Sequence, residues 1–316
     1  MRMSPFLALL LLGACSGRQT SLDPAAQQSS SLMILFMLML WVCGLAYLLM
    51  LGLLGWSLIG RRNKPGQGYS RLFGLWIGFI LLGLTVLVTG SFWIDRGLLA
   101  QADEASLHIR VTGHQWWWRI EYRTASGWVE TANIVHLPLG RTATVELRSA
   151  DVIHSFWLPN LAGKVDMLPG RSNRMVITPR RAGLFRGQCA EFCGVQHANM
   201  ALTVQVEKPA AFGRWLAAEA EPAPSVPGQG HDLFMQTSCA VCHRIRGTQA
   251  QGRVGPDLTH IASRPMLAGG AVPLTTASLR GWIIDPQGIK PGTLMPAGDL
   301  SPQDAQAVAR YLEALR

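Results

Sequence analysis

Two long apolar runs near the N-terminus constrain this chain of 316 residues more than any other feature. Residues 32–59 and residues 72–94 contain no charged side chain. A helix rises about 1.5 Å per residue and the hydrocarbon core of a bilayer is about 30 Å thick, so each run can cross a membrane. We therefore predict transmembrane helices over residues 32–60 and 72–94, joined as a hairpin.

The charges beside these runs predict the orientation of the hairpin. The connecting segment holds Arg61, Arg62, Lys64 and Arg71 but no acidic residue, so the positive-inside rule places it in the cytoplasm. Everything beyond residue 94 is then extracytoplasmic. The chain has a net charge of +9, but its other basic residues are scattered without interleaved aromatics. We therefore do not expect nucleic acid as a partner.

The N-terminus also indicates export. It reads MRMSPFLALLLLGACS, with a basic start, a short apolar stretch and small residues before Cys15. This resembles a bacterial lipoprotein signal, in which residues 1–14 are removed and Cys15 is lipidated; the alternative is an uncleaved signal-like start. Both readings favour a protein of the bacterial inner (cell) membrane with its later domains on the periplasmic side.

The remaining two thirds of the sequence divide into two domains. Residues 103–208 consist of short β-rich stretches separated by Gly and Pro, which predicts an all-β sandwich or barrel. Residues 217–230 are small and proline-rich, which is typical of a linker. Residues 231–316 have a helical pattern, and Ser301 and Asp304 form a capping-box-like start to a terminal helix.

A cluster of soft metal ligands lies near the end of the β domain. The segment QCAEFCGVQHANM contains Cys189, Cys193, His197 and Met200, and His154 lies upstream. Thiolate, thioether and imidazole groups together select copper over magnesium or calcium. A blue site with one copper needs a single cysteine, so the second one indicates either a dinuclear copper site or a disulfide between the two cysteines.

The C-terminal domain carries a haem-attachment motif. Cys239, Cys242 and His243 form CAVCH, in which two thiols would bind the haem covalently and the imidazole would bind iron. A CxxC alone could be a redox dithiol or half of a zinc site, but no second CxxC or HxxxH follows. Met295, in a loop with Gly and Pro, is the leading candidate for the second axial ligand, and Met266 is its competitor.

Several motifs together resemble a known family. They are the hairpin, GHQWWWRIEY at residues 113–122, KVDMLPGR, the cysteine-rich loop and the fused cytochrome. This order is similar to subunit II of cytochrome c oxidase in its caa-type form, which has a C-terminal cytochrome c domain. The resemblance implies a multi-domain chain with a two-helix transmembrane hairpin, an all-β cupredoxin-like domain and an all-α class I cytochrome c domain.

The resemblance also implies the roles of individual residues. The dinuclear copper centre, CuA, would be bound by His154, Cys189, Cys193, His197, Met200 and the backbone carbonyl of Glu191. The carboxylate of Glu191 would help to bind a magnesium or manganese ion at the boundary with subunit I. Trp116 would lie where electrons enter near the copper, with Asp166 and Arg171 as candidates for the shell around the ligands.

On this resemblance, we expect an electron-entry subunit of a proton-translocating oxidase. A cytochrome c or cytochrome c reductase would reduce the covalent haem, and electrons would pass through CuA to the haem of subunit I, which reduces oxygen to water. Subunit III is a further expected partner. The alternatives are the entry subunit of a CuA-containing nitric oxide reductase and a non-enzymatic periplasmic copper or electron carrier.

Two features depart from the family pattern. Residues 69–83 lack the acidic residue that family members often carry near the start of the second helix, which leaves the proton route open. Residues 103–208 hold nine acidic and twelve basic residues, so charge does not favour docking of a strongly cationic cytochrome. The linker at 217–230 could instead keep the tethered cytochrome close.

Overall fold

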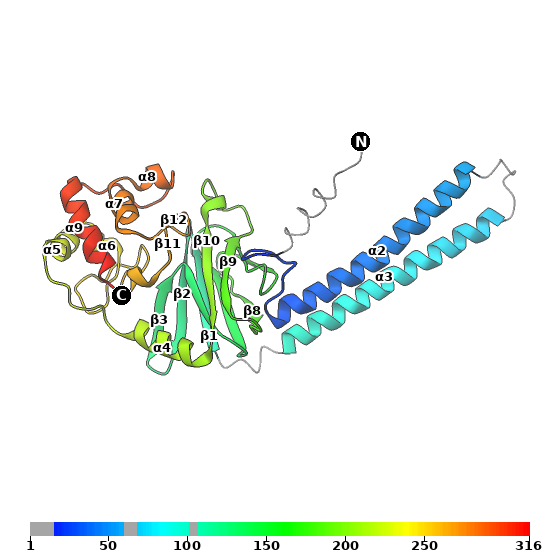
Figure 1. Cartoon of the computed structure of the whole chain (residues 1–316), viewed down its shortest axis with the longest axis horizontal. Coiled ribbons are helices and arrows are strands. Elements are labelled where there is room, and N and C mark those ends of the chain that lie inside the picture. Colours follow the sequence, from blue (N-terminus) through cyan, green and yellow to red (C-terminus); the bar gives the residue numbers. More distant parts are fainter. Residues whose placement is uncertain (1–15, 60–67, 101–106) are drawn as a thin grey trace, which may run out of the picture.

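The computed structural model describes residues 16–59, 68–100 and 107–316. In chain order it contains a helical hairpin, a domain of β strands and a small helical domain (Figure 1). The β domain lies between the other two, so the helical domain is at the end remote from the hairpin. The predicted signal, Cys15 and three of the four basic residues of the hairpin loop lie outside the described residues.

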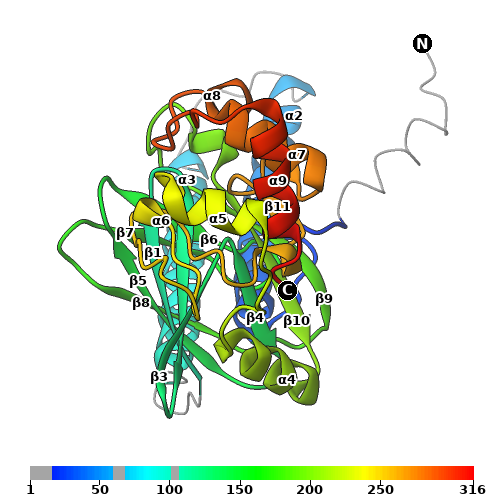
Figure 2. The same ribbon diagram turned by 90° about the vertical axis from the view of Figure 1, so that its left-hand side faces the viewer.

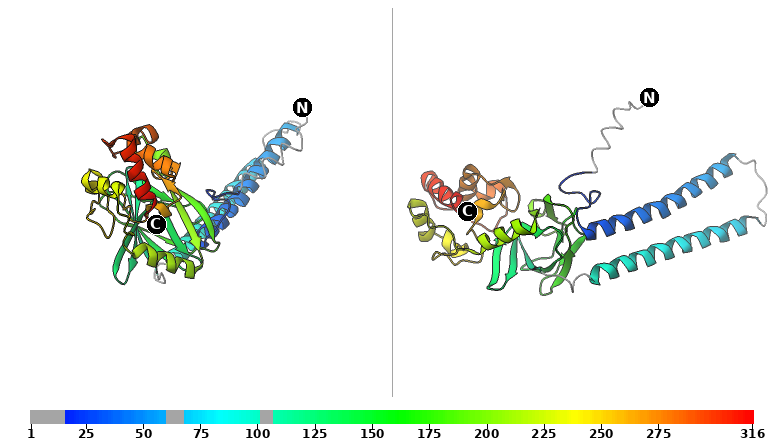
Figure 3. Two further views of the ribbon diagram at one scale, coloured as in Figure 1. Left: turned by 60° about the vertical axis from the view of Figure 1, so that its left-hand side comes forward. Right: turned by 60° about the horizontal axis from the view of Figure 1, so that its bottom comes forward.

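The hairpin consists of helices α2 (Gln27–Ile59) and α3 (Gly68–Ala100), which run side by side (Figure 3). Both are long and apolar enough to cross a membrane, and the most apolar window of each is free of buried side chains. Glycine allows close contact between them: a Cβ atom at Gly83 would lie 3.1 Å from Cγ1 of Val42.

Both helices extend beyond the predicted spans of 32–60 and 72–94. The first turn of α2 is polar and docks on the β domain, where Gln28 is buried and its Oε1 accepts the N–H of Thr178 at 2.8 Å. Ala26, just before the helix, is also buried. Contacts with a distant strand therefore keep this turn helical, and such contacts leave no mark in the local hydropathy.

Two five-stranded sheets face each other in the β domain, which confirms the all-β, cupredoxin-like prediction. The first has the order β3-β2-β1-β5-β8 and the second β4-β10-β9-β6-β7. The pairs β1–β5 and β4–β10 are parallel, and the others are antiparallel. The strands are β1 (Leu107–His114), β2 (Trp117–Thr124), β3 (Gly127–Ala132), β4 (Ile134–Pro138), β5 (Ala143–Ser149), β6 (His154–Trp157), β7 (Lys164–Met167), β8 (Asn173–Ile177), β9 (Gly183–Cys189) and β10 (Ala201–Glu207).

Helix α4 (Pro209–Ala220) follows the last strand and packs on the β domain. Its Trp215 stacks on His136 of β4 with ring centroids 3.8 Å apart, and its Phe212 is buried. The helix includes residues 217–220, which the sequence analysis placed in the linker. The anchored aromatic side chains explain why the helix continues into the alanine-rich start of that segment.

The C-terminal domain is mainly helical, as predicted, with one additional two-residue β pair. The terminal helix begins at the predicted cap, because Oγ of Ser301 accepts the N–H of Asp304 at 3.1 Å. This helix packs against α5 (Gln229–Gln236) and α7 (Thr276–Ile284), as Figure 2 shows. The side chains of its apolar stripe are buried. The elements are α5 (Gln229–Gln236), α6 (Cys239–Cys242), η3 (Ile261–Ser263), β11 (Met266–Leu267), β12 (Val272–Pro273), α7 (Thr276–Ile284), α8 (Pro286–Ile289) and α9 (Pro302–Glu313).

Candidate metal and haem sites

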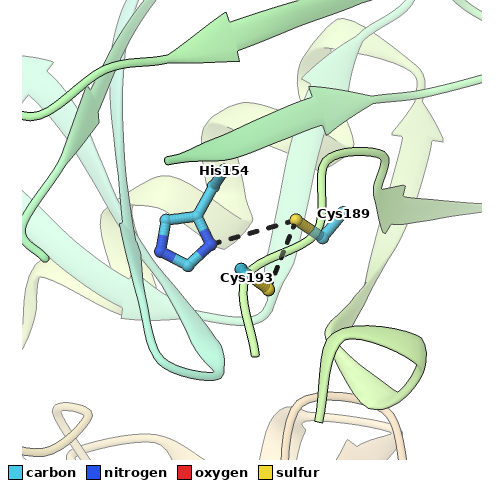
Figure 4. Close-up of side chains that lie close together, drawn as sticks. All are labelled: His154, Cys189 and Cys193. Carbon is cyan, nitrogen blue, oxygen red and sulfur yellow. Dashed lines mark hydrogen bonds between the residues drawn. The ribbon is translucent and has the colours of Figure 1, made fainter. Parts of the chain in front are cut away.

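Strand pairing brings two cysteines and a histidine together inside the β domain. Strand β9 ends at Cys189, which pairs with Phe156 of β6, and His154 begins that strand. The sulfur of Cys189 lies 3.8 Å from that of Cys193 and 3.9 Å from Nδ1 of His154 (Figure 4). All three residues are buried and both cysteines are free thiols, so the structure does not contain the alternative disulfide.

The other predicted copper ligands lie around the same pair of sulfurs. Nδ1 of His197 is 3.6 Å from the sulfur of Cys193, and the sulfur of Met200 is 3.7 Å from it. The backbone oxygen of Glu191 is 3.2 Å from the sulfur of Cys189. Two histidines therefore flank the sulfur pair, with the thioether and the carbonyl beside it.

This donor set fits copper chemically. Both imidazoles turn Nδ1 towards a sulfur, and soft sulfur and nitrogen donors suit copper. The neighbouring Cys193 thiol, together with His154, lowers the pKa of Cys189 to about 3, whereas the contact with Cys189 raises the pKa of Cys193. The pair thus readily carries one negative charge, and a bound cation would displace the second proton.

Asp151 orients one of these ligands and was missed in the sequence analysis. Its Oδ1 lies 2.7 Å from Nε2 of His154, and its two oxygens also accept the N–H groups of Gln115 and Val152, each at 2.7 Å. A carboxylate at Nε2 fixes the tautomer that leaves Nδ1 free to bind metal. An acidic residue three positions before the histidine was the available signal.

The two residues proposed from sequence for this outer shell lie in different surroundings. Asp166 is on β7, opposite Ser155 of β6, and its side chain is exposed. Arg171 is exposed as well. The structure thus brings Asp151, and neither of these two, into hydrogen-bonding contact with His154.

Trp116 lies directly beside the cysteine loop. Its Nε1 donates a hydrogen bond to the backbone oxygen of Cys193 at 2.9 Å, and Nε2 of Gln115 donates to the same oxygen at 2.8 Å. The neighbouring Trp118 is fully buried and packs edge-on against Phe156. Trp118 therefore belongs to the core of the β domain. Trp116 instead lies at the surface of that domain, against the cysteine loop.

The CxxCH motif lines a cavity of about 640 Å³ in the C-terminal domain. Cys239, Cys242 and His243 lie on its wall together with both candidate ligands, Met266 and Met295. Nδ1 of His243 lies 2.8 Å from the backbone oxygen of Pro256, so Nδ1–H donates and Nε2 is left for iron. Both methionines thus line the same cavity as the CxxCH motif.

The rest of the cavity fits a haem. Apolar side chains including Phe234, Leu258 and Trp282 line it. Within the described part of the chain, Nε of Arg264 and Nε2 of His114 are buried without a hydrogen-bond partner, and both residues line the cavity. The unpaired N–H of Arg264 suits a carboxylate of a haem, because a buried polar group without a partner is costly.

One wall of this cavity comes from the β domain. Trp116 and neighbouring residues of the β1–β2 turn line it, as do the residues of the CxxCH motif. The same Trp116 side chain donates to the oxygen of Cys193. The haem cavity and the cysteine cluster therefore share a single aromatic side chain, which the sequence pattern could not reveal.

Comparisons with known proteins agree with this arrangement. Residues 123–207 match the family described as cytochrome C oxidase subunit II, periplasmic domain, and residues 228–316 match cytochrome c. Over 331 residues the chain is 32% identical to cytochrome c oxidase subunit 2 of Alkalihalophilus pseudofirmus, covering 98% of this chain and 95% of the relative. The chain belongs to the cytochrome c oxidase subunit 2 family.

Other relatives of the chain carry the same name. The protein of Bacillus subtilis is 28% identical over 285 residues, covering 82% of this chain and 79% of the relative. Among solved structures, the periplasmic domain of subunit II from Bradyrhizobium japonicum is 32% identical and covers 36% of this chain and 94% of that chain, with a TM-score of 0.35. The family match and the two named relatives confirm the predicted family and the prediction of a cytochrome c oxidase subunit, and membership supports a membrane-anchored protein with a periplasmic domain.

Proposed function

We propose that this chain passes electrons from a cytochrome c or cytochrome c reductase through a covalent haem c and a dinuclear CuA centre to the haem of subunit I, where oxygen is reduced to water. The observation that carries the proposal is the double role of Trp116. It lines the haem cavity and donates a hydrogen bond to the carbonyl of Cys193. Trp116 thus contacts both candidate sites.

The copper centre would be held by residues of the β6–β9 region. Cys189, Cys193, His154 and His197 would hold the two coppers, and Met200 and the carbonyl of Glu191 would be the weaker ligands. When bound, the copper pair would accept one electron and pass it on. Asp151 would hold the His154 ring in place, because it accepts the hydrogen bond from Nε2.

The haem would be held by the C-terminal domain. Cys239 and Cys242 would form the thioether bonds, and His243 and Met295 would bind the iron, with Met266 as the alternative to Met295. The hydrogen bond to Pro256 keeps Nε2 of His243 directed at the cavity. Ligation by Met and His raises the potential of a haem, which suits an electron carrier.

Further parts of the proposal concern the surroundings. Glu191 would offer its carboxylate to a magnesium or manganese ion at the boundary with subunit I, and subunit III would complete the complex. The hairpin would anchor the chain in a bacterial inner membrane, with Cys15 lipidated and both redox domains in the periplasm. The partly exposed position of Glu191 leaves its carboxylate available to a partner subunit.

The purified complex tests the function. With a reduced cytochrome c as donor, we expect oxygen uptake, and metal analysis should give two coppers and one haem c in this chain. Consumption of nitric oxide without oxygen uptake would contradict the proposal in favour of a nitric oxide reductase. If metal analysis found copper but no covalent haem, the proposed order of electron transfer would be contradicted, because the haem is its first step.

A further inference from the structure

Lys290 occupies an unusual position at the end of the short helix α8. It is only 2% exposed, although a lysine is almost never fully buried unless its charge is satisfied. Its Nζ donates to three backbone oxygens: those of Trp116 at 2.7 Å, Ala268 at 2.8 Å and Asn199 at 2.9 Å. All three N–H bonds of the ammonium group therefore have an acceptor.

These three oxygens belong to two different domains. Trp116 and Asn199 are in the β domain; Trp116 touches the cysteine loop, and Asn199 immediately precedes the candidate ligand Met200. Ala268 is in the C-terminal domain, beside the short strand β11. Lys290 thus connects the electron-entry tryptophan and the copper loop to the haem-binding domain through a single cation.

Neighbouring contacts fasten the two domains at the same place. The N–H of Ala201 donates to the oxygen of Gly269 at 2.9 Å, and Nε2 of Gln196 donates to the oxygen of Pro291 at 2.7 Å. Gly292 has a φ of +85°, which favours glycine, and a Cβ atom there would lie 2.7 Å from Cγ2 of Val195, so the two loops approach closely. The loop that follows Lys290 therefore fits against the copper loop and leads directly to Met295.

A second contact lies on another part of the boundary. Nη2 of Arg253 is 2.9 Å from Oε2 of Glu130 on β3, and Nη2 of Arg119 donates to the backbone oxygen of Arg253 at 2.6 Å. Two separated contacts restrict rotation as well as distance. If the cytochrome domain were held only by the flexible linker, neither these contacts between the domains nor the buried ammonium group would be expected.

We propose that Lys290 is a positioning residue that locks the cytochrome domain onto the Trp116 face of the copper domain and thereby fixes the path between the two redox centres. This inference rests on the proposed function, because it concerns transfer between those centres. Burial of a cation is costly, and the cost is offset only while all three carbonyls are in place. The ammonium group of Lys290 consequently has all three of its hydrogen bonds only when the two domains are docked.

The lock has a consequence for the electron donor. Trp116 is only 7% exposed, because residues of the cytochrome domain lie against it. A soluble donor cannot then reach Trp116 while the domains are locked. Electrons from outside should enter at the haem and should not bypass it.

The test compares Lys290→Met with Lys208→Met in the complete oxidase complex. Lys290→Met keeps a similar length but removes all three donors, whereas Lys208 is an exposed lysine before α4, so its replacement removes the same charge away from the boundary. Absorption spectra of haem and copper establish that both centres are loaded. The rate of electron transfer from haem to copper is then measured after photoreduction of the haem.

We expect Lys290→Met to slow this transfer about tenfold or more, because small displacements of reacting groups cost large factors in rate. The amide of Ala201, whose acceptor is in the other domain, should exchange its hydrogen faster, while Lys208→Met should match the wild type in both measurements. If Lys290→Met yields no loaded protein, Lys290→Gln, which retains part of the hydrogen bonding, is measured in its place.

An unchanged transfer rate together with unchanged exchange at Ala201 would overturn the inference. Equal slowing by Lys208→Met would also overturn it, because the effect would then come from charge and not from position. The proposed function fails separately: in that case the wild-type complex itself would show no transfer from haem to copper.

Discussion

Replacement of Asp151 by asparagine should weaken copper binding at the cysteine cluster. In the wild type, three donors converge on this carboxylate: Nε2 of His154 and the N–H groups of Gln115 and Val152. Asparagine keeps one oxygen but turns an NH₂ group towards at least one of these donors. The negative charge that makes the His154 ring a better ligand is lost as well.

Two estimates give the size of the effect. Loss of a partner that orients a metal-bound histidine typically lowers metal affinity about 10- to 100-fold, or about 1.4–2.7 kcal/mol. Loss of one hydrogen bond to a charged group costs about 1.5–3 kcal/mol. The two ranges overlap, so we expect copper affinity to fall by at least about tenfold.

Competition with a copper chelator measures this affinity, and the purple CuA absorption reports whether the remaining copper is correctly bound. Asp166→Asn is the matched control, because Asp166 is an exposed aspartate on β7. It should leave affinity and absorption unchanged. Copper affinity in Asp151→Asn equal to that of the wild type would refute the orienting role of this carboxylate.

Other changes test the haem site and the connection between the centres. Met295→Leu should lower the haem potential and admit carbon monoxide to the iron, whereas Met266→Leu should do neither; the opposite pattern would assign the ligand to Met266. Trp116→Phe removes the Nε1 donor and should slow transfer from haem to copper about tenfold after photoreduction, and an unchanged rate would contradict its bridging role. Gly255→Ala would press a methyl group against the ring of His243, so covalent haem per chain should fall in a haemochrome assay; full loading would show that the ring can move aside.

Features with a local physical cause could be predicted from the sequence. Uncharged runs long enough to span the hydrocarbon core of a bilayer predicted the hairpin, and short β-rich stretches predicted the all-β domain. The CxxCH motif and the cap at Ser301 depend on neighbours within a few residues, and the structure has Ser301 as the cap. The chemistry of five candidate copper ligands could also be read from the sequence, whereas the role of the Glu191 carbonyl and the choice of two coppers over a disulfide came only from the resemblance.

Features that depend on distant packing could not be predicted in this way. Lys290 is an ordinary lysine in the sequence, and its burial follows from loops around Trp116, Asn199 and Ala268 that converge only in the folded chain. The early start of α2 depends on the contact between Gln28 and Thr178. The contribution of Trp116 to the wall of the haem cavity also could not be predicted, because no local sequence pattern indicates that the β domain covers the cavity.

The most direct test of the electron path is anaerobic rapid mixing of the oxidase complex with a reduced cytochrome c donor, with haem c and copper followed by absorption. We predict that haem c is reduced first and that copper follows at a rate independent of donor concentration. A Cys239→Ser, Cys242→Ser variant that lacks the haem should then show almost no copper reduction. Copper reduction at the wild-type rate in that variant would contradict the account.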